Sequence, residues 1–374
     1  MREGLSKSRG LPPPGSMSSN KRVRTVTASG SFEKMGLKIG RECAPISKSM
    51  LSAARAGLKE RGISWGMAIE QSALRLPYAE EFDPEYVKFI RGYARGAQQR
   101  FEDMFVLLCQ DEKGMCTDIA VNMDATADGS VMSAHTEDWK PEDEKHVVLV
   151  RGEPDGETSF LLMTLGGLEF IGGMNSAGIS FTGNSLSQND ARVGIPKIFL
   201  ADRIAGSETI GEAVSAALAI DRGSSYNSNI CHSSGEMYSV EGSATDAALI
   251  YPKSGCLVHT NHYIHPKMAK YEGLFSEGGS GTYFPMGSSS LIRYNRALRL
   301  VKDKLGQVTR QTLISILSDH VDFPHSICRH ADKSASRFDQ SKTIYAMIAD
   351  VTNLDLWVCL GEPCKGRFER HSLG

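Results

Sequence analysis

The chain has 374 residues, of which 41% are hydrophobic and 23% charged, a composition that can bury a sizeable core and excludes a wholly disordered protein. Its 42 basic and 44 acidic residues give a formal net charge of −2. This balance lacks the positive excess of a nucleic-acid binder and favours small or neutral partners. No apolar run approaches the roughly 20 residues that span a bilayer, and the N-terminus lacks an apolar signal segment, so we expect a cytoplasmic protein without membrane contact.

The chain changes character twice along its length. The first residues are rich in Ser, Pro and basic side chains, so we expect residues 1–30 to form a disordered or added tail outside the fold. From 31 to 109, apolar residues recur at three- and four-residue spacing, which predicts a mainly helical segment with one helix opened by Pro84. At Cys116 the pattern switches to short alternating strands separated by turn residues.

The rest of the chain predicts two groups of strands with helices between them. Strands are expected at SFLLMTL, LEFIGGM and GISFTGNSL, then helices opened by Pro196 and by the capping-box pattern at Thr209 to Glu212. A meander of YNSNICHS, EMYSVEGS, DAALIYP and CLVHTNHY follows, then helices SSSLIRYNRALRLVKDKL and TRQTLISILSDH, then the strand pair KTIYAMIADV and LDLWVCLGE. Two packed antiparallel sheets with helices on both outer sides, an α+β fold, would bury these runs. We expect residues 31–374 to form a single domain.

The eight cysteines contain no CxxC pair and are too dispersed for a disulfide scaffold. They are Cys43, Cys109, Cys116, Cys231, Cys256, Cys328, Cys359 and Cys364. Most are expected to be small buried hydrophobic residues. Cys116 differs, because it begins the first strand of the β-rich part directly after a charged, turn-prone stretch.

Cleavage before Cys116 would create a chemically competent nucleophile. A loop ahead of a first strand can be cut without unravelling the fold. The liberated α-amine would have a pKa near 8, close to working pH. It could therefore accept the thiol proton, so that base and nucleophile would belong to one residue.

The following hairpin places polar side chains near that thiol. A two-residue turn at Asp128-Gly129 would put Cys116 opposite residues near 138–141, allowing for a bulge. His135, Glu137 and Asp138 are then expected close to the sulfur. A carboxylate there could hold the amine, while His135 could shape the pocket or supply a proton; a solvated strand end is the alternative.

These motifs carry a resemblance to a known family. MCTDIAVN followed by ATADGSVMSAHTEDW resembles the acyl-coenzyme A:6-aminopenicillanic acid acyltransferase family, N-terminal-nucleophile hydrolases related to β-alanyl-dopamine hydrolases, choloylglycine hydrolases and penicillin V acylases. The similarity continues through GGMNSAGISFTGNSLS, VHTNHY, GSSSLIRYNRA, HSICRHAD and KTIYAMIADVTNLDLWVCLGEPC. It implies a four-layer αββα fold and self-cleavage before the cysteine, giving an α-chain of residues 1–115 and a β-chain of residues 116–374.

The resemblance also implies roles for individual residues. Cys116 would be the nucleophile, and Asp138 the carboxylate that orients its amine. The remaining matches are His135 beside the thiol, Asn184 and Asn261 at the oxyanion hole, and Arg293 near the nucleophile. An amide NH2 aimed at the developing oxyanion suits amide cleavage, and an arginine can lower a thiol pKa.

One position departs from the family pattern. Relatives usually have Gly-Cys at the cut, whereas here Met115 separates Gly114 from Cys116. A bulky residue could slow the N-to-S acyl shift, because the peptide must twist and expose its carbonyl. This departure is the best support for a different class of function, a silent unprocessed relative acting as a binding protein.

Two further interpretations compete for the chemistry. His259, His262 and His265 in HTNHYIHP invite a metal, but residues three apart on a strand face opposite sides. Cys328 lies between His325 and His330 and next to Arg329, so a conventional thiol enzyme is conceivable. We expect Cys328 to be structural and neither a metal nor a cofactor to be required.

The predicted activity is therefore that of a thiol-dependent amidase or acyltransferase acting on linear amides through a thioester on Cys116. The substrate would be a small N-acyl amide, with an amine or acyl-CoA as a second substrate where acyl transfer replaces hydrolysis. Hydrolysis is the first expectation, and a homo-oligomer is allowed. The Gly-rich residues 273–287 are either a loop at the pocket mouth or a plain surface connection.

Overall fold

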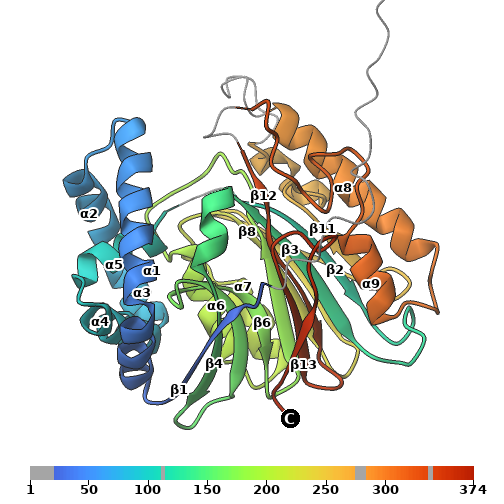
Figure 1. The fold of residues 1–374 in the computed structure, drawn as a ribbon, viewed down its shortest axis with the longest axis horizontal. Coiled ribbons are helices and arrows are strands. Elements are labelled where there is room, and N and C mark those ends of the chain that lie inside the picture. Colours follow the sequence, from blue (N-terminus) through green and yellow to red (C-terminus); the bar gives the residue numbers. More distant parts are fainter. Residues whose placement is uncertain (1–20, 111–113, 274–283, 336–339) are drawn as a thin grey trace, which may run out of the picture.

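The computed structural model describes residues 21–110, 114–273, 284–335 and 340–374, which form two β-sheets stacked between helical layers (Figure 1). Helices α1, α6 and α7 cover the outer face of the larger sheet, and α8 and α9 cover the outer face of the smaller one. The inner faces meet where β2 and β3 contact β7. The predicted α+β class and the αββα order of layers are confirmed.

The larger sheet has eight strands in the order β1-β4-β5-β6-β7-β8-β9-β10. Strand β1 runs parallel to β4, and the other neighbours are antiparallel. The strands are β1 Arg24–Gly30, β4 Val147–Pro154, β5 Phe160–Leu165, β6 Glu169–Asn175, β7 Ile179–Asn184, β8 Tyr226–His232, β9 Met237–Gly242 and β10 Ala247–Ile250.

The smaller sheet has six antiparallel strands in the order β11-β2-β3-β12-β13-β14. They are β2 Met115–Val121, β3 Met132–Trp139, β11 Cys256–His259, β12 Lys342–Asp350, β13 Asp355–Leu360 and β14 Glu369–Ser372. The predicted meander is thus divided, because β8, β9 and β10 stay in the larger sheet whereas β11 pairs with β2 in the smaller one.

The helices follow the predicted segments closely. They are α1 Phe32–Glu60, α2 Trp65–Ala73, α3 Leu76–Phe82, α4 Pro84–Ala97, α5 Phe101–Leu108, α6 Lys197–Ala205, α7 Ile210–Ala217, α8 Phe284–Lys302 and α9 Arg310–Leu317, with short 3-10 helices at Pro141–His146 and Pro266–Tyr271. The capping box at Thr209 is formed, since both of its hydrogen bonds with Glu212 are present. Among the described helices, none has the length and apolarity needed to cross a membrane.

The two longest helices of the N-terminal layer pack through glycines. A Cβ atom added at Gly36 or Gly40 of α1 would lie 2.0 or 2.2 Å from a backbone oxygen of α4, and one added at Gly92 would lie 2.1 Å from the Glu33 oxygen of α1. Any side chain at these positions would force the backbones apart. The absence of a Cβ therefore fixes the close crossing of α1 and α4 over the sheet.

The expected boundary of the N-terminal tail is wrong for its last residues. Residues 1–20 lie outside the described part, but Arg24–Gly30 forms β1, with Val26 and Ala28 buried. Its partner β4 begins at Val147, more than a hundred residues later. Because β1 is stabilised by pairing with β4, its own sequence gives little indication that it forms a strand.

The register of the β2-β3 hairpin also differs from the prediction. Cys116 lies opposite Glu137, and Met115 opposite Asp138. The strands separate at Val121 and Met132, so the connection is much longer than a two-residue turn. Tertiary hydrogen bonds hold this connection, from Asn122 N–H to the Gly255 oxygen and from Ala127 N–H to the Val308 oxygen, and they shift the pairing relative to a tight turn.

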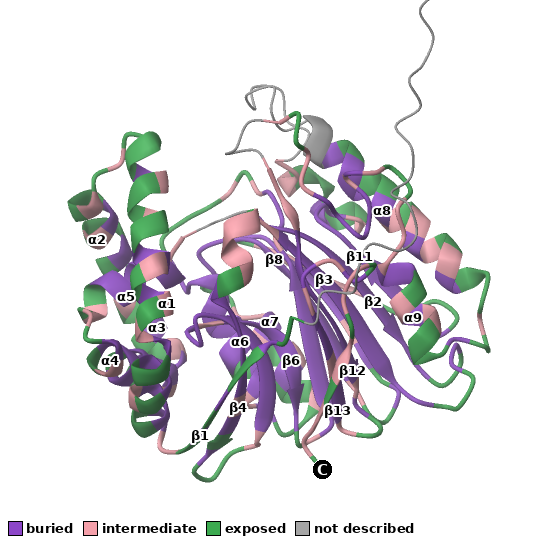
Figure 2. Cartoon of the chain, viewed as in Figure 1, coloured by how far each residue is buried: buried purple, intermediate pink, exposed green. Residues whose placement is uncertain are grey.

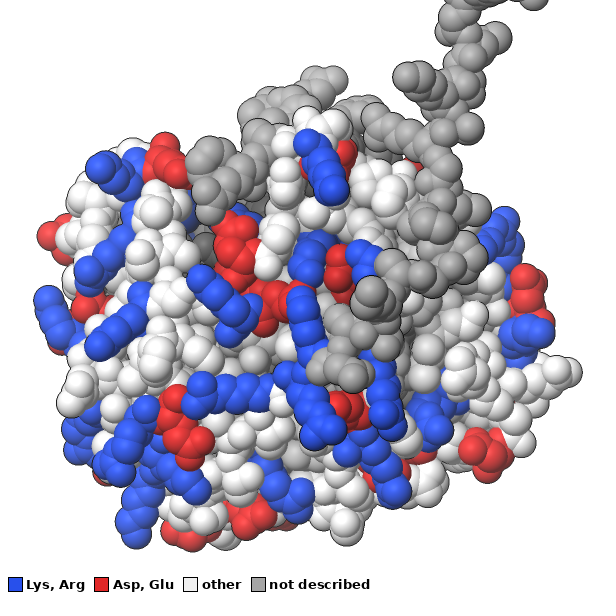
Figure 3. Space-filling view, viewed as in Figure 1, with Lys and Arg blue, Asp and Glu red and all other residues white. Residues whose placement is uncertain are grey.

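Burial is greatest on the strands between the helical layers, whereas the outer turns of the helices are exposed (Figure 2). One continuous apolar cluster joins the larger sheet to the N-terminal helices, and a second joins the smaller sheet to α8 and α9. On the face shown in Figure 3, basic and acidic side chains are interspersed. The start of β2, which contains Cys116, therefore lies in the buried interior between the helical layers.

Candidate active site

Cys116 is the second residue of β2, in the interior of the smaller sheet between β11 and β3. The register places Glu137 opposite Cys116 and His135 opposite Asp118. Because side chains alternate along a strand, these four side chains share one face of the sheet. That face meets the larger sheet, as Ser133 on the same face contacts the Ser180 hydroxyl of β7 at 3.0 Å.

The four side chains form a continuous polar chain. The Cys116 thiol donates to Glu137 Oε1 at 3.5 Å, and the other oxygen of Glu137 lies 2.8 Å from His135 Nε2. His135 Nδ1 lies 2.5 Å from Asp118 Oδ1. Both ring nitrogens thus face carboxylates, an arrangement that suits the doubly protonated imidazolium.

The electrostatics of the chain follow from burial and charge. Burial alone would lower the pKa of His135, but Asp118 and Glu137 outweigh it and raise that pKa to about 10. Burial raises the pKa of the Cys116 thiol well above its usual value, and the carboxylates of Glu137, Asp118 and Asp138 raise it further, whereas Arg293 lowers it. Burial and the carboxylates both favour the protonated thiol over the thiolate.

The thiol is covered in the intact chain. Cys116 is 2% exposed, and Met115 ahead of it is 3% exposed. Residues 111–113, which precede the expected cut, lie outside the described part of the chain. The sulfur is therefore not open to solvent in the intact chain.

Asn261 and Arg293 hold the backbone of Cys116. The Cys116 N–H donates to Asn261 Oδ1 at 2.9 Å, and Asn261 Nδ2 donates to the oxygens of Gly114 at 3.3 Å and Ser185 at 3.1 Å. Arg293 donates to the Cys116 carbonyl oxygen at 2.5 Å and to Asn261 Oδ1 at 2.8 Å. The nitrogen that cleavage would liberate is therefore already positioned by a side-chain oxygen.

Asn184 ends β7 with a free donor. Its Oδ1 accepts from Asn227 Nδ2 at 3.2 Å and lies 3.0 Å from His259 Nδ1, while the other nitrogen of His259 contacts Glu241 at 2.8 Å. Its Nδ2 is buried and has no hydrogen-bond partner in the described structure. A buried unpaired NH2 group is costly unless a ligand, intermediate or water uses it.

Further buried polar atoms on the facing strands have no hydrogen-bond partner among the described residues. Those that face the space between the sheets are Asp118 Oδ2, Thr182 Oγ1, both side-chain polar atoms of Asn229, and Tyr345 Oη. Tyr345 lies close to the thiol, because burial raises its pKa most and the charges of Glu137 and Cys116 raise it further. This concentration indicates that the space between the sheets is polar around Cys116.

Asp138 lies on the opposite face of the sheet from the thiol. Its carboxylate accepts from Thr343 Oγ1 at 2.7 Å and from Arg329 Nε at 3.3 Å. Burial raises the pKa of Asp138, and the Arg329 and Arg293 guanidinium groups oppose that shift. The carboxylate in contact with the sulfur is Glu137, one of the two acidic residues expected close to the thiol. The role of Asp138 in orienting the amine of a cleaved Cys116 stays a prediction.

Sequence reasoning brought together most of the site but missed two of its members. Asp118 could have been found, because it lies two residues after Cys116 and strand alternation puts both side chains on one face. Arg329 gave no such signal, since only folding brings it to Asp138 and to Ser289 Oγ, at 2.6 Å, beside Arg293.

The structure also places the residues of the two competing interpretations, the three histidines of HTNHYIHP and Cys328. His259 contacts Glu241, His262 contacts Ser290 Oγ at 2.8 Å, and His265 accepts from the Lys267 N–H, so within the described residues these three do not form a metal-binding group. The Gly-rich segment 273–287 lies mostly outside the described residues. Cys328 is buried and its thiol lies 3.5 Å from His330 Nε2.

Cys116 also belongs to a group of side chains with the geometry to hold a metal ion. The ligand atoms of Cys116, His135 and Glu137 lie within 4.8 Å of one another. However, both nitrogens of His135 face carboxylates, and Glu137 Oε1 also accepts from the Trp139 indole N–H. A hydrogen-bonded network accounts for all of these contacts.

Comparison with known proteins agrees with this architecture. Residues 125–365 match the model of the family described as acyl-coenzyme A:6-aminopenicillanic acid acyl-transferase. The chain belongs to this family. The match includes His135, Glu137, Asn184, Asn261 and Arg293 and begins downstream of Cys116, so it does not cover that cysteine.

Several solved structures, described as an amidase, an acylase and a hydrolase, are similar at low sequence identity. The Caenorhabditis elegans N-acylethanolamine-hydrolyzing acid amidase ortholog has 13% identity and a TM-score of 0.44, covering 63% of this chain and 93% of that chain. Penicillin V acylase from Agrobacterium tumefaciens has 13% identity and a TM-score of 0.37, covering 66% and 83%. A mutant of conjugated bile acid hydrolase from Clostridium perfringens has 12% identity and a TM-score of 0.43, covering 70% and 97%. Likeness at this level says nothing about substrate.

Proposed function

We propose that this family member is a self-processing amidohydrolase or acyltransferase that is cut between Met115 and Cys116 and then uses Cys116 as an N-terminal nucleophile. The observation that carries the proposal is the pair of contacts at Cys116. Its nitrogen is held by Asn261 and its thiol by Glu137, at the start of a buried strand. Residues up to Met115 would form the α-chain, and residues from Cys116 the β-chain.

The processing step requires a thiolate and a distorted peptide. Glu137 takes the thiol proton, and the sulfur attacks the carbonyl carbon of Met115. The tetrahedral intermediate breaks its C–N bond, the nitrogen gains a proton and becomes the α-amine, and the Met115 acyl group is left on sulfur as a thioester. Water then hydrolyses the thioester, which releases the Met115 carboxylate and restores the thiol.

Turnover would repeat this chemistry on an external amide. The α-amine, held by Asn261 Oδ1, accepts the thiol proton, and the sulfur attacks the substrate carbonyl. The carbon–nitrogen bond breaks, the leaving amine takes that proton, and the acyl group remains on Cys116. Water resolves the thioester in hydrolysis, and an acceptor amine resolves it in acyl transfer.

Two amide groups are suited to stabilise the oxyanion. The Nδ2 of Asn184 is buried and unpaired among the described residues. The Nδ2 of Asn261 holds the Gly114 oxygen in the intact chain and would become available when the cleaved segment leaves. Preorganised donors of this kind contribute roughly 3–4 kcal/mol each to lowering the barrier.

The burial of the thiol supports cleavage as the opening step. In the intact chain a 2% exposed cysteine cannot meet an external substrate. Removal of the segment that ends at Met115 would uncover the sulfur, the amine and one hydrogen of Asn261 Nδ2 together. The substrate class proposed is a small linear N-acyl amide, with an amine or acyl-CoA as the second substrate in acyl transfer.

The same burial favours one second candidate, an unprocessed binding protein with a silent cysteine. Mass spectrometry of purified chain separates the two. The enzyme proposal expects one fragment that ends at Met115 and one that begins with Cys116, and the Cys116→Ala variant stays intact. Screening the processed protein against N-acyl amino acids, β-alanyl amines and penicillin V, with and without an amine acceptor, should give acylation of Cys116. An intact wild-type chain that resists every reactive acyl donor would favour the silent protein.

A further inference from the structure

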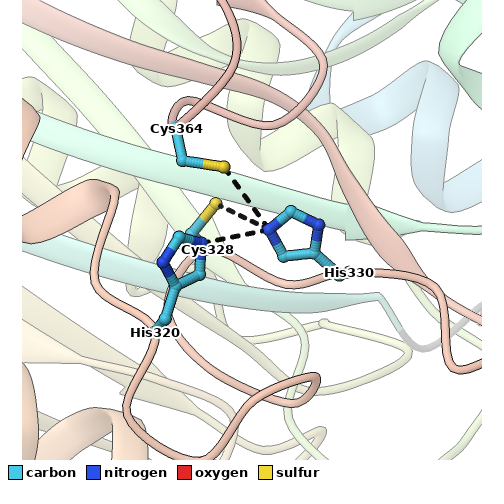
Figure 4. Close-up of side chains that lie close together, drawn as sticks. All are labelled: His320, Cys328, His330 and Cys364. Carbon is cyan, nitrogen blue, oxygen red and sulfur yellow. Dashed lines mark hydrogen bonds between the residues drawn. The ribbon is translucent and has the colours of Figure 1, made fainter. Parts of the chain in front are cut away.

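A second cluster of thiols and imidazoles lies away from Cys116, where four side chains converge (Figure 4). His320 and the pair Cys328 and His330 follow helix α9, and Cys364 follows strand β13. One ligand atom from each lies within 4.8 Å of all the others. No sequence pattern indicates that Cys364 and His320 lie together, because they come from separate segments that only the fold brings into contact.

Hydrogen bonding alone does not account for this convergence. His330 Nε2 lies 3.1 Å from His320 Nε2, 3.5 Å from Cys328 Sγ and 3.4 Å from Cys364 Sγ. A neutral imidazole nitrogen has either one proton or one lone pair, so it can serve one of these neighbours well and not all three. A cation placed between the four atoms would satisfy all of them.

The spacing matches the edges of a tetrahedral zinc site. Zinc bonds of about 2.3 Å to sulfur and about 2.0–2.1 Å to nitrogen give edges of about 3.4 Å between two nitrogens and about 3.6 Å between nitrogen and sulfur in a regular tetrahedron. The observed separations of 3.1, 3.5 and 3.4 Å agree within a few tenths of an ångström. Two thiolates with two imidazoles are the ligand set of many structural zinc sites.

The surroundings also suit a bound ion. The other ring nitrogen of His330 faces Glu362 Oε1 at 3.7 Å, an electrostatic contact that turns Nε2 towards the cluster. The Phe323 ring lies 5.2 Å from the His330 ring and gives the site an apolar side. Cys364 is exposed, which provides a route of entry for the metal.

We propose that His320, Cys328, His330 and Cys364 bind a structural zinc ion that fastens the segment after α9 to the segment after β13. The proposal is independent of self-processing. Its consequence for the active site is positional, because Arg329 lies between two of the ligands and its guanidinium group contacts Asp138 at 3.3 Å and Ser289 at 2.6 Å. The metal would hold this arginine in place without meeting the substrate.

Elemental analysis of the full chain, purified under reducing conditions and dialysed, tests the proposal. We expect close to one zinc per chain, and cobalt substitution should give the visible bands of tetrahedral Co²⁺ with thiolate ligands. The Cys364→Ser and His330→Ala variants should lose the metal on dialysis. Cys109→Ser, which removes a thiol elsewhere, should retain it.

A measurement on the unaltered protein covers the case in which a variant fails to fold. Titration with a mercurial thiol reagent should release zinc to a chromophoric indicator as Cys328 and Cys364 react. Zinc retained by Cys364→Ser, a wild-type chain that binds neither zinc nor cobalt, or a Cys328–Cys364 disulfide in protein prepared without oxidant would each overturn the assignment.

Discussion

The described part of the molecule contains two clusters of cysteine and histidine side chains, which differ in the group that lies between the thiol and the imidazole. At Cys116, the carboxylate of Glu137 lies between the thiol and His135, and Asp118 lies beyond the imidazole. At His330, two thiols face the imidazole directly. A carboxylate between sulfur and imidazole provides a base and balances an imidazolium, which suits a nucleophile. A second thiol in its place completes a ligand set for a metal.

The sharpest test of this contrast changes the two adjacent carboxylates of β3 one at a time. Glu137→Gln keeps the shape but removes the base in contact with the thiol, so the rate of chain cleavage should fall roughly 10²- to 10⁴-fold. Asp138→Asn should slow cleavage less, since its carboxylate lies on the other face of the sheet. The rates are measured as fragment formation by mass spectrometry. Loss of cleavage in Asp138→Asn alone would show that Asp138, and not Glu137, is the base.

Removing the imidazolium should destabilise the folded chain. His135→Gln, made in a Cys116→Ala background that stays intact, leaves two buried carboxylates without their shared cation and should lower the free energy of unfolding by roughly 3–5 kcal/mol. The folded pKa of His135 is raised to about 10 from 6.5. The stabilisation is therefore complete below pH 6.5 and disappears as the pH rises through about 10.

Denaturant unfolding across that pH range measures the difference in the free energy of unfolding between Cys116→Ala and the same variant that also carries His135→Gln. The control is His262→Gln, since His262 is a buried histidine bonded to Ser290 and its pKa is lowered to about 3 by burial, His259 and Arg293. The cost of His262→Gln in the free energy of unfolding should stay constant between pH 6.5 and 10, whereas the cost of His135→Gln should decrease. A pH-independent cost for His135→Gln would contradict the imidazolium assignment.

The oxyanion donor can be tested after processing. Asn184→Ala should reduce kcat of the cleaved enzyme roughly 10²- to 10³-fold, with little change in KM, because its Nδ2 has no partner in the described structure. Asn227→Ala removes the donor to Asn184 Oδ1 and the acceptor of Ser239 Oγ but leaves Asn184 Nδ2 in place, so it should reduce kcat less. Steady-state kinetics on the best substrate separates the two parameters. An effect confined to KM would place Asn184 in substrate binding instead.

Metal removal examines the second cluster. At free zinc about 100-fold above the dissociation constant, the ion should stabilise the chain by roughly 3 kcal/mol, so a chelator should lower Tm of the wild type and of Cys109→Ser alike. Cys364→Ser should melt at the lower temperature with or without chelator. Calorimetry checks this, and an equal response of Cys364→Ser would place the chelator effect elsewhere.

The smallest effect is expected at a third polar cluster, which has no imidazole between its carboxylates. Burial and Asp83 raise the pKa of Asp202, and burial raises that of Asp83. Because their folded pKa values are raised, the pair loses stability as the pH rises above about 4. Asp202→Asn should therefore flatten this decline in the free energy of unfolding between pH 4 and neutral pH. Unfolding curves at pH 4 and 7 measure the decline in each protein. An Asp202→Asn variant that declines as steeply as the wild type would contradict the prediction.

Much of the fold was predictable because its signals are local. Helical periodicity over 31–109, the capping box at Thr209 and the closing strand pair all depend on residues that are neighbours in sequence. Strand β1 and the exchange of β11 into the smaller sheet were not predicted, because both are stabilised by partners far along the chain. The hairpin register failed for the same reason, since tertiary contacts hold the connection after Val121.

The site divides in the same way. The sequence by itself determined that Cys116 lies at the start of a strand and that His135 to Asp138 lie on the next one, because strand alternation and turn residues are local properties. Only the tertiary structure decided that Glu137 meets the sulfur, that Arg329 meets Asp138 and that Cys364 joins His330. A shift in strand register exchanges which side chains are opposite one another, and contacts between distant segments arise only when the layers pack. Both are consequences of the whole fold rather than of any short stretch of residues.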